Sequence, residues 1–336
     1  MSKLTRGGVW PTMTTPFTMD DQVDYEALGK QVEWYISRGV SGLFAVCQSS
    51  EMFFLSLQER AEIARFVRER AGERVPVIAS GHISDSLEEQ AEEVHAMSET
   101  GVDAVVLITN RLAREDDSDE IWIERMEELL RHIPKDTALG LYECPYPYKR
   151  LLSEKLIEWC ASSGRFRFLK DTSCDIAHIR MKLEALQGSG LQLFNANSAT
   201  LLESLKLGVA GYSGVMANFH PELYARLINR WEDNEEEALR LSDFLSLSAL
   251  IEKQLYPVNA KYNFMLEGVY TNTCSRTLRG QDLTATQRME VEQLSRLTEQ
   301  FSYLTEQFSR LSGQGSPKMG QISGLSGRKS FAHDQV

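Results

Sequence analysis

The feature that most constrains the fold is a repeat of short apolar runs, each followed by a longer amphipathic stretch. Parallel strands joined by crossover helices give this alternation. Several of the runs are apolar almost throughout, as expected when both faces of a sheet are covered. The eight runs occupy residues 7–17, 41–46, 76–81, 104–109, 138–143, 166–171, 191–197 and 211–215.

The number of these units decides between two parallel-sheet folds. Eight units fit a closed barrel of about 250 residues better than an open doubly wound sheet. No GxGxxG opens the first unit, which removes the main reason to expect a dinucleotide-binding sheet. Helix starts support the reading, since Ser56 with Glu59 and Ser86 with Glu89 have the spacing of capping boxes. The sequence therefore predicts a (β/α)₈ TIM barrel with additional C-terminal helices.

The C-terminal third departs from the repeat. We expect the barrel core over residues 1–220 and a helical extension over 221–311. Residues 312–336 are rich in Gly and Ser, which predicts a disordered tail. Residues 290–310 repeat a seven-residue unit, so the last helix has a heptad seam. This seam either packs on the barrel, the favoured interpretation, or joins two subunits. It consists of Leu294, Leu297, Phe301, Leu304, Phe308 and Leu311.

Charge and composition exclude several classes of partner. A net charge of −12 and a pI near 5.1 argue against nucleic acid, which needs a basic face. No apolar run approaches the ~20 residues of a membrane span, and the start lacks the apolar core of a signal peptide. The five cysteines form no CxxC pair, which favours a reducing, cytoplasmic location.

Two side chains at neighbouring strand ends indicate chemistry, because the reactive residues of such barrels lie where strands end. Lys170 follows an apolar run. If it is buried, its pKa falls and its amine can attack a carbonyl to form a Schiff base. Tyr142 ends the preceding strand, about 4.8 Å away in a parallel sheet, and a phenol there can shuttle protons. The plainer alternatives are a lysine paired with an acid and a tyrosine covering a turn.

Hydroxyl groups follow the second strand. Ser49 and Ser50, together with the amides of a tight loop, form an arrangement able to hold a carboxylate. A hydroxyl-capped loop that binds nothing is the alternative.

Four segments in order resemble the dihydrodipicolinate synthase and N-acetylneuraminate lyase family. They are GGVWPTMTTPF, LYECP, FLKDTS and LKLGVAGYSGVMAN, and the resemblance runs from about residue 8 to 278. It implies a class I aldolase that forms a Schiff base with pyruvate or a related 2-oxo acid. No cofactor or metal is expected, and the assembly is expected to be a homodimer or homotetramer.

The resemblance also implies roles for individual residues. Lys170 would form the imine, Tyr142 would shuttle protons, and Ser49 with the loop amides would bind the carboxylate. Further residues are expected to bind or flank the substrate: Gln48, Ser50, Ser213, Arg111 and Asn197.

Three departures from the family pattern argue against dihydrodipicolinate synthesis itself. Gln48 replaces a hydroxyl of the synthases' proton relay, Arg111 stands where its second tyrosine is expected, and Pro147 replaces an arginine that grips the aldehyde's carboxylate. Arg111 would then bind a second anionic group of a longer substrate, or pair with Glu143 or the acidic run 115–120. Glu143, often Asn in the family, has no role assigned by the sequence.

The predicted function is a Schiff-base lyase (aldolase, synthase or dehydratase) acting on pyruvate or a 2-keto-3-deoxy acid. A synthase proper and a non-catalytic barrel that binds a small acid are the alternatives. A metal-dependent hydrolase is disfavoured, because only His82 lies just past a strand end and such sites need clustered ligands.

Overall fold

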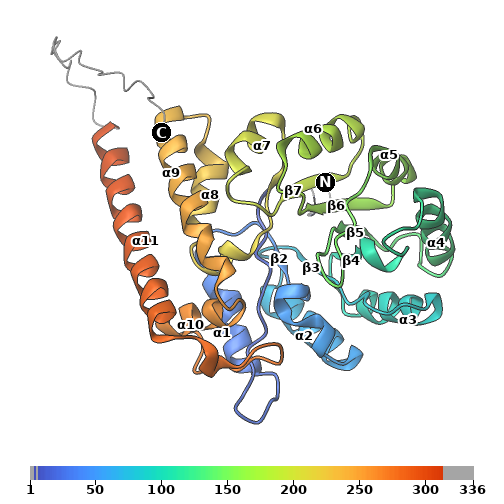
Figure 1. The fold of residues 1–336 in the computed structure, drawn as a ribbon, viewed down its shortest axis with the longest axis horizontal. Helices are drawn as coiled ribbons and strands as arrows, with labels where there is room; N and C mark the ends of the chain where they lie inside the picture. Colours follow the sequence, from blue (N-terminus) through green and yellow to red (C-terminus); the bar gives the residue numbers. More distant parts are fainter. Residues whose placement is uncertain (1–3, 5–6, 313–336) are drawn as a thin grey trace, which may run out of the picture. The chain divides into compact units, whose positions relative to one another are not determined.

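The barrel is built from one sheet of eight parallel strands. The computed structural model describes Leu4 and residues 7–312, with side chains through residue 303. Strand order is β1-β8-β7-β6-β5-β4-β3-β2 (Figure 1). The strands are β1 (Gly8–Val9), β2 (Leu43–Phe44), β3 (Val77–Ala79), β4 (Ala104–Ile108), β5 (Leu139–Tyr142), β6 (Phe166–Asp171), β7 (Gln192–Asn195) and β8 (Gly211–Tyr212).

Closure of the sheet depends on the segment that follows β1. Thr12 forms a parallel bridge with Phe44 of β2. The Phe44 amide donates to the Pro11 carbonyl at 3.0 Å, and the Ser41 amide donates to the Val9 carbonyl at 2.8 Å. The first and last strands of the order are thus joined, which confirms the predicted (β/α)₈ barrel.

Helices follow the strands and surround the sheet (Figure 1). The Ser56 capping box is confirmed, with the Ser56 side chain accepting from the Glu59 amide and Glu59 accepting from the Ser56 amide. The barrel helices are α1 (Tyr25–Ser37), α2 (Leu57–Ala71), α3 (Leu87–Ser98), α4 (Asp119–Arg131), α5 (Glu154–Ser163), α6 (Ile176–Ala185) and α7 (Leu201–Leu207). The later helices are α8 (Pro221–Arg230), α9 (Glu235–Ser248), α10 (Val258–Leu266) and α11 (Ala285–Ser312).

Aromatic rings fill the interior of the barrel. Phe168 lies at the centre, with ring centroids 4.5 Å from Phe194, 5.4 Å from Trp10 and 6.1 Å from Phe44. Phe44 in turn contacts Tyr142 edge-on at 5.9 Å. Offset and edge-to-face pairs of this kind stabilise a core beyond their buried area. The Tyr142 ring therefore packs on the aromatic core of the barrel.

The chain divides into two compact units, Met1–Arg296 and Leu297–Val336, and α11 crosses their boundary. In the first unit the seam residue Leu294 is buried. The side chains of Leu304, Phe308 and Leu311 lie outside the described residues. Of the tail predicted over 312–336, residue 312 is the last residue of α11, and the rest lies outside the described residues. The proposed domain limits and the partner of the heptad seam stay predictions.

A buried ion pair ties the loop after β2 to α10. Lys261 Nζ lies 2.5 Å from Glu51 Oε1, and both side chains are almost fully buried. The other Glu51 oxygen accepts from the amides of Arg276 and Thr277 at 2.6 and 2.9 Å. The pair therefore holds the rim residue Thr277 against the barrel mouth.

We expect Lys261→Met to lower the free energy of unfolding by about 3–5 kcal/mol, because it leaves a buried carboxylate unpaired. Urea denaturation followed by circular dichroism measures the change. Lys206→Met removes an exposed partner of Glu203 and should change stability by less than about 1 kcal/mol. Equal effects of the two substitutions would contradict this view of the buried pair.

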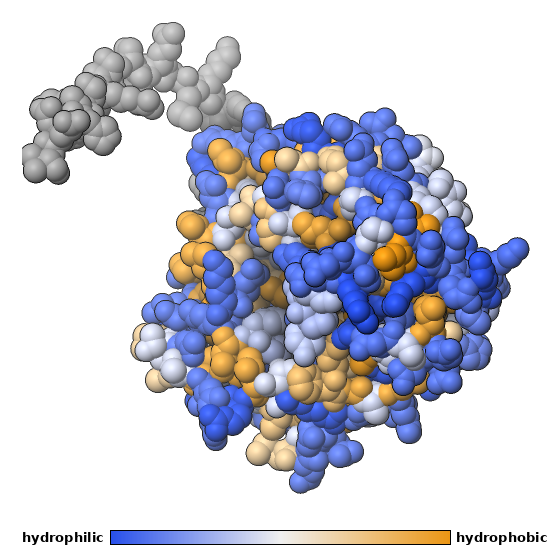
Figure 2. Space-filling model, turned by 45° about the vertical axis from the view of Figure 1, so that its right-hand side comes forward, coloured by the Kyte–Doolittle hydropathy of each residue, from blue (hydrophilic) through white to orange (hydrophobic). Residues whose placement is uncertain are grey.

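The surface is mixed in character. On the face shown in Figure 2, hydrophobic residues lie in separate groups among hydrophilic ones. Within the described residues, no helix combines the length and the apolarity that crossing a bilayer requires.

Candidate active site

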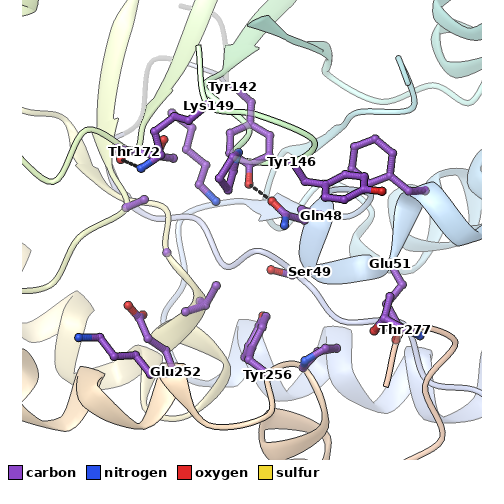
Figure 3. Close-up of a pocket in the computed structure, with 18 of the residues that line it drawn as sticks. Gln48, Ser49, Glu51, Tyr142, Tyr146, Lys149, Thr172, Glu252, Tyr256 and Thr277 are labelled. Carbon is purple, nitrogen blue, oxygen red and sulfur yellow. Dashed lines mark hydrogen bonds between the residues drawn. The ribbon is translucent and has the colours of Figure 1, made fainter. Parts of the chain in front are cut away.

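A pocket of about 590 Å³ opens where the strands end (Figure 3). Its walls come from the loops after β2, β5, β6, β7 and β8 and from the segments around α10. This is the edge of a (β/α)₈ barrel at which the βα loops meet. Five residues singled out in the sequence line it: Gln48, Ser49, Tyr142, Lys170 and Asn197.

Lys170 extends from β6 into this pocket and is only 3% exposed. Burial lowers the pKa of Lys170 to about 8, and the nearby Cys47, Cys144 and Glu252 oppose this shift only in part. Within the described part of the chain, no carboxylate forms an ion pair with its ammonium. The acid-paired alternative is therefore wrong, and a substantial fraction of the amine is neutral near pH 8.

Tyr142 lies beside this lysine. The two residues are register partners across β5 and β6, and Lys170 Nζ is 4.5 Å from the centre of the Tyr142 ring. The phenol donates to Gln48 Oε1 at 3.4 Å (Figure 3). Burial raises the pKa of Tyr142 well above its ordinary value, so the group stays protonated and able to donate.

The two serines after β2 have different surroundings. Ser49 lines the pocket. The Ser50 hydroxyl instead lies 2.7 Å from the Met13 carbonyl and 2.9 Å from the Ala45 carbonyl, and it accepts from the Cys47 amide. Ser50 thus fastens the loop to the barrel, and it is not among the lining residues. The pocket gives no support to its predicted contact with substrate.

Tyr256 is a pocket residue that sequence reasoning missed. Its phenol points toward Ser49 (Figure 3) and accepts from Asn218 Nδ2 at 3.2 Å. Burial raises its pKa above the ordinary range. The residue precedes α10, outside the strand ends, so its only sequence signal was the helix break at a Tyr-Pro pair.

The ends of β7 and β8 form another wall. Asn197 lines the pocket, and its Oδ1 accepts from the Thr200 amide at 3.0 Å. Ser213 is fully buried and is not among the lining residues, whereas the next residue, Gly214, is. A Cβ at Gly214 would meet the Ala196 carbonyl at 2.4 Å. The wall therefore requires a glycine, and Ser213 only flanks it.

Arg111 does not line the pocket. Its guanidinium pairs with Asp85 at 2.6 Å and lies 5.5 Å from the ring of Phe53. The expected ion pair with Glu143 or with the acidic run 115–120 is wrong, because the partner of Arg111 is Asp85, in the loop between β3 and α3. Phe53 does line the pocket and packs on Tyr146 at 4.8 Å, so Arg111 supports an aromatic wall.

Charged groups at the rim were also missed by the sequence reasoning. Lys149 lines the pocket and donates to the Thr172 carbonyl at 2.8 Å (Figure 3). Glu252 lines the opposite side, and burial raises its pKa. Lys149 comes two residues after Pro147, which replaces the arginine of the synthases. A cation so close to that position could have indicated from the sequence that Lys149 lines the site.

His82 has a structural role. Its Nε2 is 2.9 Å from Gln90 Oε1, its Nδ1 accepts from the Ile108 amide, and burial lowers its pKa to about 4. Within the described ranges, no group of three His, Cys, Asp or Glu side chains could hold a metal ion.

Lys170 and Tyr142 thus lie side by side and buried at the mouth of a (β/α)₈ barrel. A model of the dihydrodipicolinate synthetase family matches residues 5–299. The chain belongs to this family, and it is an aldolase- or synthase-type lyase. The family predicted from the four sequence segments is confirmed.

The similar proteins include a synthase and an aldolase. One is the 4-hydroxy-tetrahydrodipicolinate synthase of Clostridium perfringens (strain SM101 / Type A), 28% identical over 75% of this chain and 86% of its own length. Another is the putative 2-dehydro-3-deoxy-D-gluconate aldolase YagE of Escherichia coli K12, 26% identical over 68% of this chain and 75% of its own.

Solved structures agree on the fold. The crystal structure of YagE in complex with pyruvate has a TM-score of 0.77 at 24% identity and covers 88% of this chain and 98% of its own. The Cyanidioschyzon merolae dihydrodipicolinate synthase with lysine bound has a TM-score of 0.79 at 21% identity, covering 88% and 99%.

Proposed function

We propose that the protein is a Schiff-base-forming lyase that acts on pyruvate or a 2-keto-3-deoxy acid that releases it. One observation carries the proposal: the amine of Lys170 is buried in the pocket, lacks an acid partner among the described residues and lies beside Tyr142. The pyruvate complex of the related YagE supports the choice of ligand. The cytoplasmic location and the homo-oligomer expected from the sequence stay predictions.

The chemistry follows from the two side chains. The neutral amine of Lys170 adds to the C2 carbonyl, and Tyr142 protonates the resulting hydroxyl, which leaves as water. The phenolate left on Tyr142 by that step takes a proton from C3 of the iminium, which gives an enamine that adds to an aldehyde, and Tyr142 returns the proton to the new C4 alkoxide. In the reverse direction, the Tyr142 phenolate formed during imine formation accepts the proton of the C4 hydroxyl as the C3–C4 bond breaks, and Tyr142 then protonates C3 of the enamine. Hydrolysis of the imine then frees the lysine.

The carboxylate of the 2-oxo acid fits the wall formed by Ser49. The Ser49 hydroxyl, the amides of its loop and the Tyr256 phenol can all donate to an anion there. Gln48 and Asn197 present amide groups on either side of the same pocket. Ser213 supports the wall formed by the ends of β7 and β8, through its neighbour Gly214.

The second substrate is larger than the pyruvate unit. A pocket of about 590 Å³ holds more than a three-carbon acid, since sites of ≈300–1,000 Å³ suit drug-sized ligands. Its outer part combines the Phe53–Tyr146 wall with Lys149 and Glu252. These groups suit a hydroxylated carbon chain better than the small aldehyde used by the true synthases. The residues that relay protons and bind the carboxylate of that aldehyde in the synthases are replaced here by Gln48, Arg111 and Pro147.

Release of pyruvate from a panel of 2-keto-3-deoxy acids tests the reaction. Each acid is incubated with the protein, and pyruvate is followed through lactate dehydrogenase. Release from at least one acid, together with a pyruvate adduct trapped by borohydride, is the expected result. Condensation of pyruvate with aspartate semialdehyde instead would identify a synthase proper, and binding without an adduct would identify a non-catalytic barrel.

The pH dependence of trapping gives a further prediction. Because the pKa of Lys170 is lowered to about 8, the neutral amine increases as pH rises through 8 rather than through the ordinary 10.5. The initial rate of pyruvate-dependent borohydride trapping should therefore rise about tenfold from pH 6 to 7 and level off above 8. Mass spectrometry of the quenched protein measures it. A rate that still climbs tenfold per unit above pH 9 would contradict the lowered pKa.

A further inference from the structure

Two buried carboxylates lie directly behind the proposed reacting pair. Glu143 follows Tyr142 and Asp171 follows Lys170, and both acids are fully buried. Successive side chains of a strand point to opposite faces, so these acids face the helix layer while the phenol and the amine face the pocket. Two desolvated carboxylates on neighbouring strands are strongly unfavourable unless a cation pairs with them.

Lys182 of α6 supplies that cation. Its Nζ donates to Glu143 Oε1 and, at 2.6 Å, to Asp171 Oδ2, and none of the three side chains is exposed. One ammonium thus joins the ends of β5 and β6 from behind. These residues form the Glu143–Lys182–Asp171 cluster.

The cluster also fastens the loops that leave both strands. Glu143 accepts from the Leu152 amide at 2.8 Å and from the Thr172 amide at 3.1 Å. Asp171 Oδ1 accepts from the amide and the hydroxyl of Ser173 at 3.0 and 2.8 Å. All four carboxylate oxygens are therefore hydrogen-bonded, and each bond constrains chain adjacent to the site.

We propose that the Glu143–Lys182–Asp171 cluster is a positioning device that sets the Tyr142 phenol against the Lys170 amine. This inference rests on the proposed function. The cluster fixes the residue after each reacting side chain, and the Glu143 amide donates to the Lys170 carbonyl at 3.3 Å. Displacement of a reacting group by about 1 Å can lower a rate by 10²-fold. None of the three residues of the cluster lines the pocket.

Glu143→Gln tests the positioning role with little change in size. The amide nitrogen of the glutamine must face either Lys182 or the Thr172 amide. Both of these groups are hydrogen-bond donors, so one of the two hydrogen bonds is lost. We expect turnover per borohydride-labelled Lys170 to fall by about 10–100-fold. The KM for substrate should change by less than about threefold, because the carboxylate wall at Ser49 lies on another strand.

Glu93→Gln is the matched control. Glu93 is equally buried, pairs with Arg60 at 3.0 Å and accepts from the Ile83 and Ser84 amides. It lies on α3, away from Lys170. This variant should lose stability and yet keep wild-type turnover per labelled site, because the normalisation removes the effect of unfolded protein.

A second variant protects the test against misfolding. If Glu143→Gln yields no folded protein, Asp171→Asn removes a fastening on the other strand and should show the same loss per labelled site. Wild-type turnover per labelled site in either variant would overturn the positioning role. Absence of label in the wild-type protein would instead refute the Schiff-base function, so the two failures are distinguishable.

Discussion

Lys170→Ala abolishes both pyruvate-dependent labelling and turnover. Wild-type protein treated with pyruvate and borohydride gains a stable mass on the peptide that contains Lys170, and the variant gains none. Removing a covalent nucleophile lowers turnover by roughly 10⁴-fold or more. Peptide mass spectrometry locates the label, and the pyruvate-release assay gives the rate.

The pocket contains a natural control for this experiment. Lys149 lines the same cavity, but it is exposed and donates to the Thr172 carbonyl. Lys149→Met should leave the label on Lys170 intact. Lys170→Met keeps most of the side-chain volume and guards against a cavity artefact. A label that stays in Lys170→Ala, or one that disappears with Lys149→Met, would assign the imine to another amine.

The fold could be predicted because its signals are local and repeated. Apolar runs, capping residues and the number of units are read along the chain without knowledge of contacts. The same alternation placed Tyr142 and Lys170 at neighbouring strand ends, and their register confirms that adjacency. Where a residue follows a strand in sequence, its position at the barrel mouth follows from topology alone.

The rest of the site depends on contacts between distant segments. Nothing local indicates that Ser50 faces Met13 while Ser49 faces the pocket, because one backbone turn after β2 decides it. Tyr256 enters from the C-terminal extension, and its phenol points toward Ser49, more than 200 residues earlier in the chain (Figure 3). Several carboxylates near Arg111 in sequence were possible ion-pair partners. That Asp85 is the actual partner is seen only in the folded chain.

The role of Glu143 likewise depends on a contact that the sequence does not show. A carboxylate directly after Tyr142 reads equally well as a general acid or as an ion-pair partner. In the folded chain it is fully buried, contacts Lys182, 39 positions away, and does not line the pocket. A buried charge must be paired, but the sequence does not show which lysine pairs with it.

Tyr142→Phe should lower turnover by about 10²–10⁴-fold, the range for losing a general acid–base group. The substitution keeps the ring that packs on Phe44 and removes a hydroxyl whose bond to Gln48 is 3.4 Å long. Stability should therefore change by less than about 1.5 kcal/mol. Because burial keeps the phenol protonated, its loss slows departure of water from the carbinolamine. Labelling of Lys170 should slow in parallel, while the final extent of labelling is preserved.

Tyr25→Phe separates this effect from a general loss of phenols. Tyr25 donates to Glu62 at 3.3 Å and lies outside the pocket, so the variant should turn over at the wild-type rate.

Stopped-flow trapping divides the reaction into imine formation and carbon–carbon cleavage. A Tyr142→Phe protein that forms the imine at full speed but cleaves slowly would confine the phenol to the C4 hydroxyl. Full speed in both steps would remove Tyr142 from the mechanism and leave Tyr256, the other phenol beside Ser49, to move the proton.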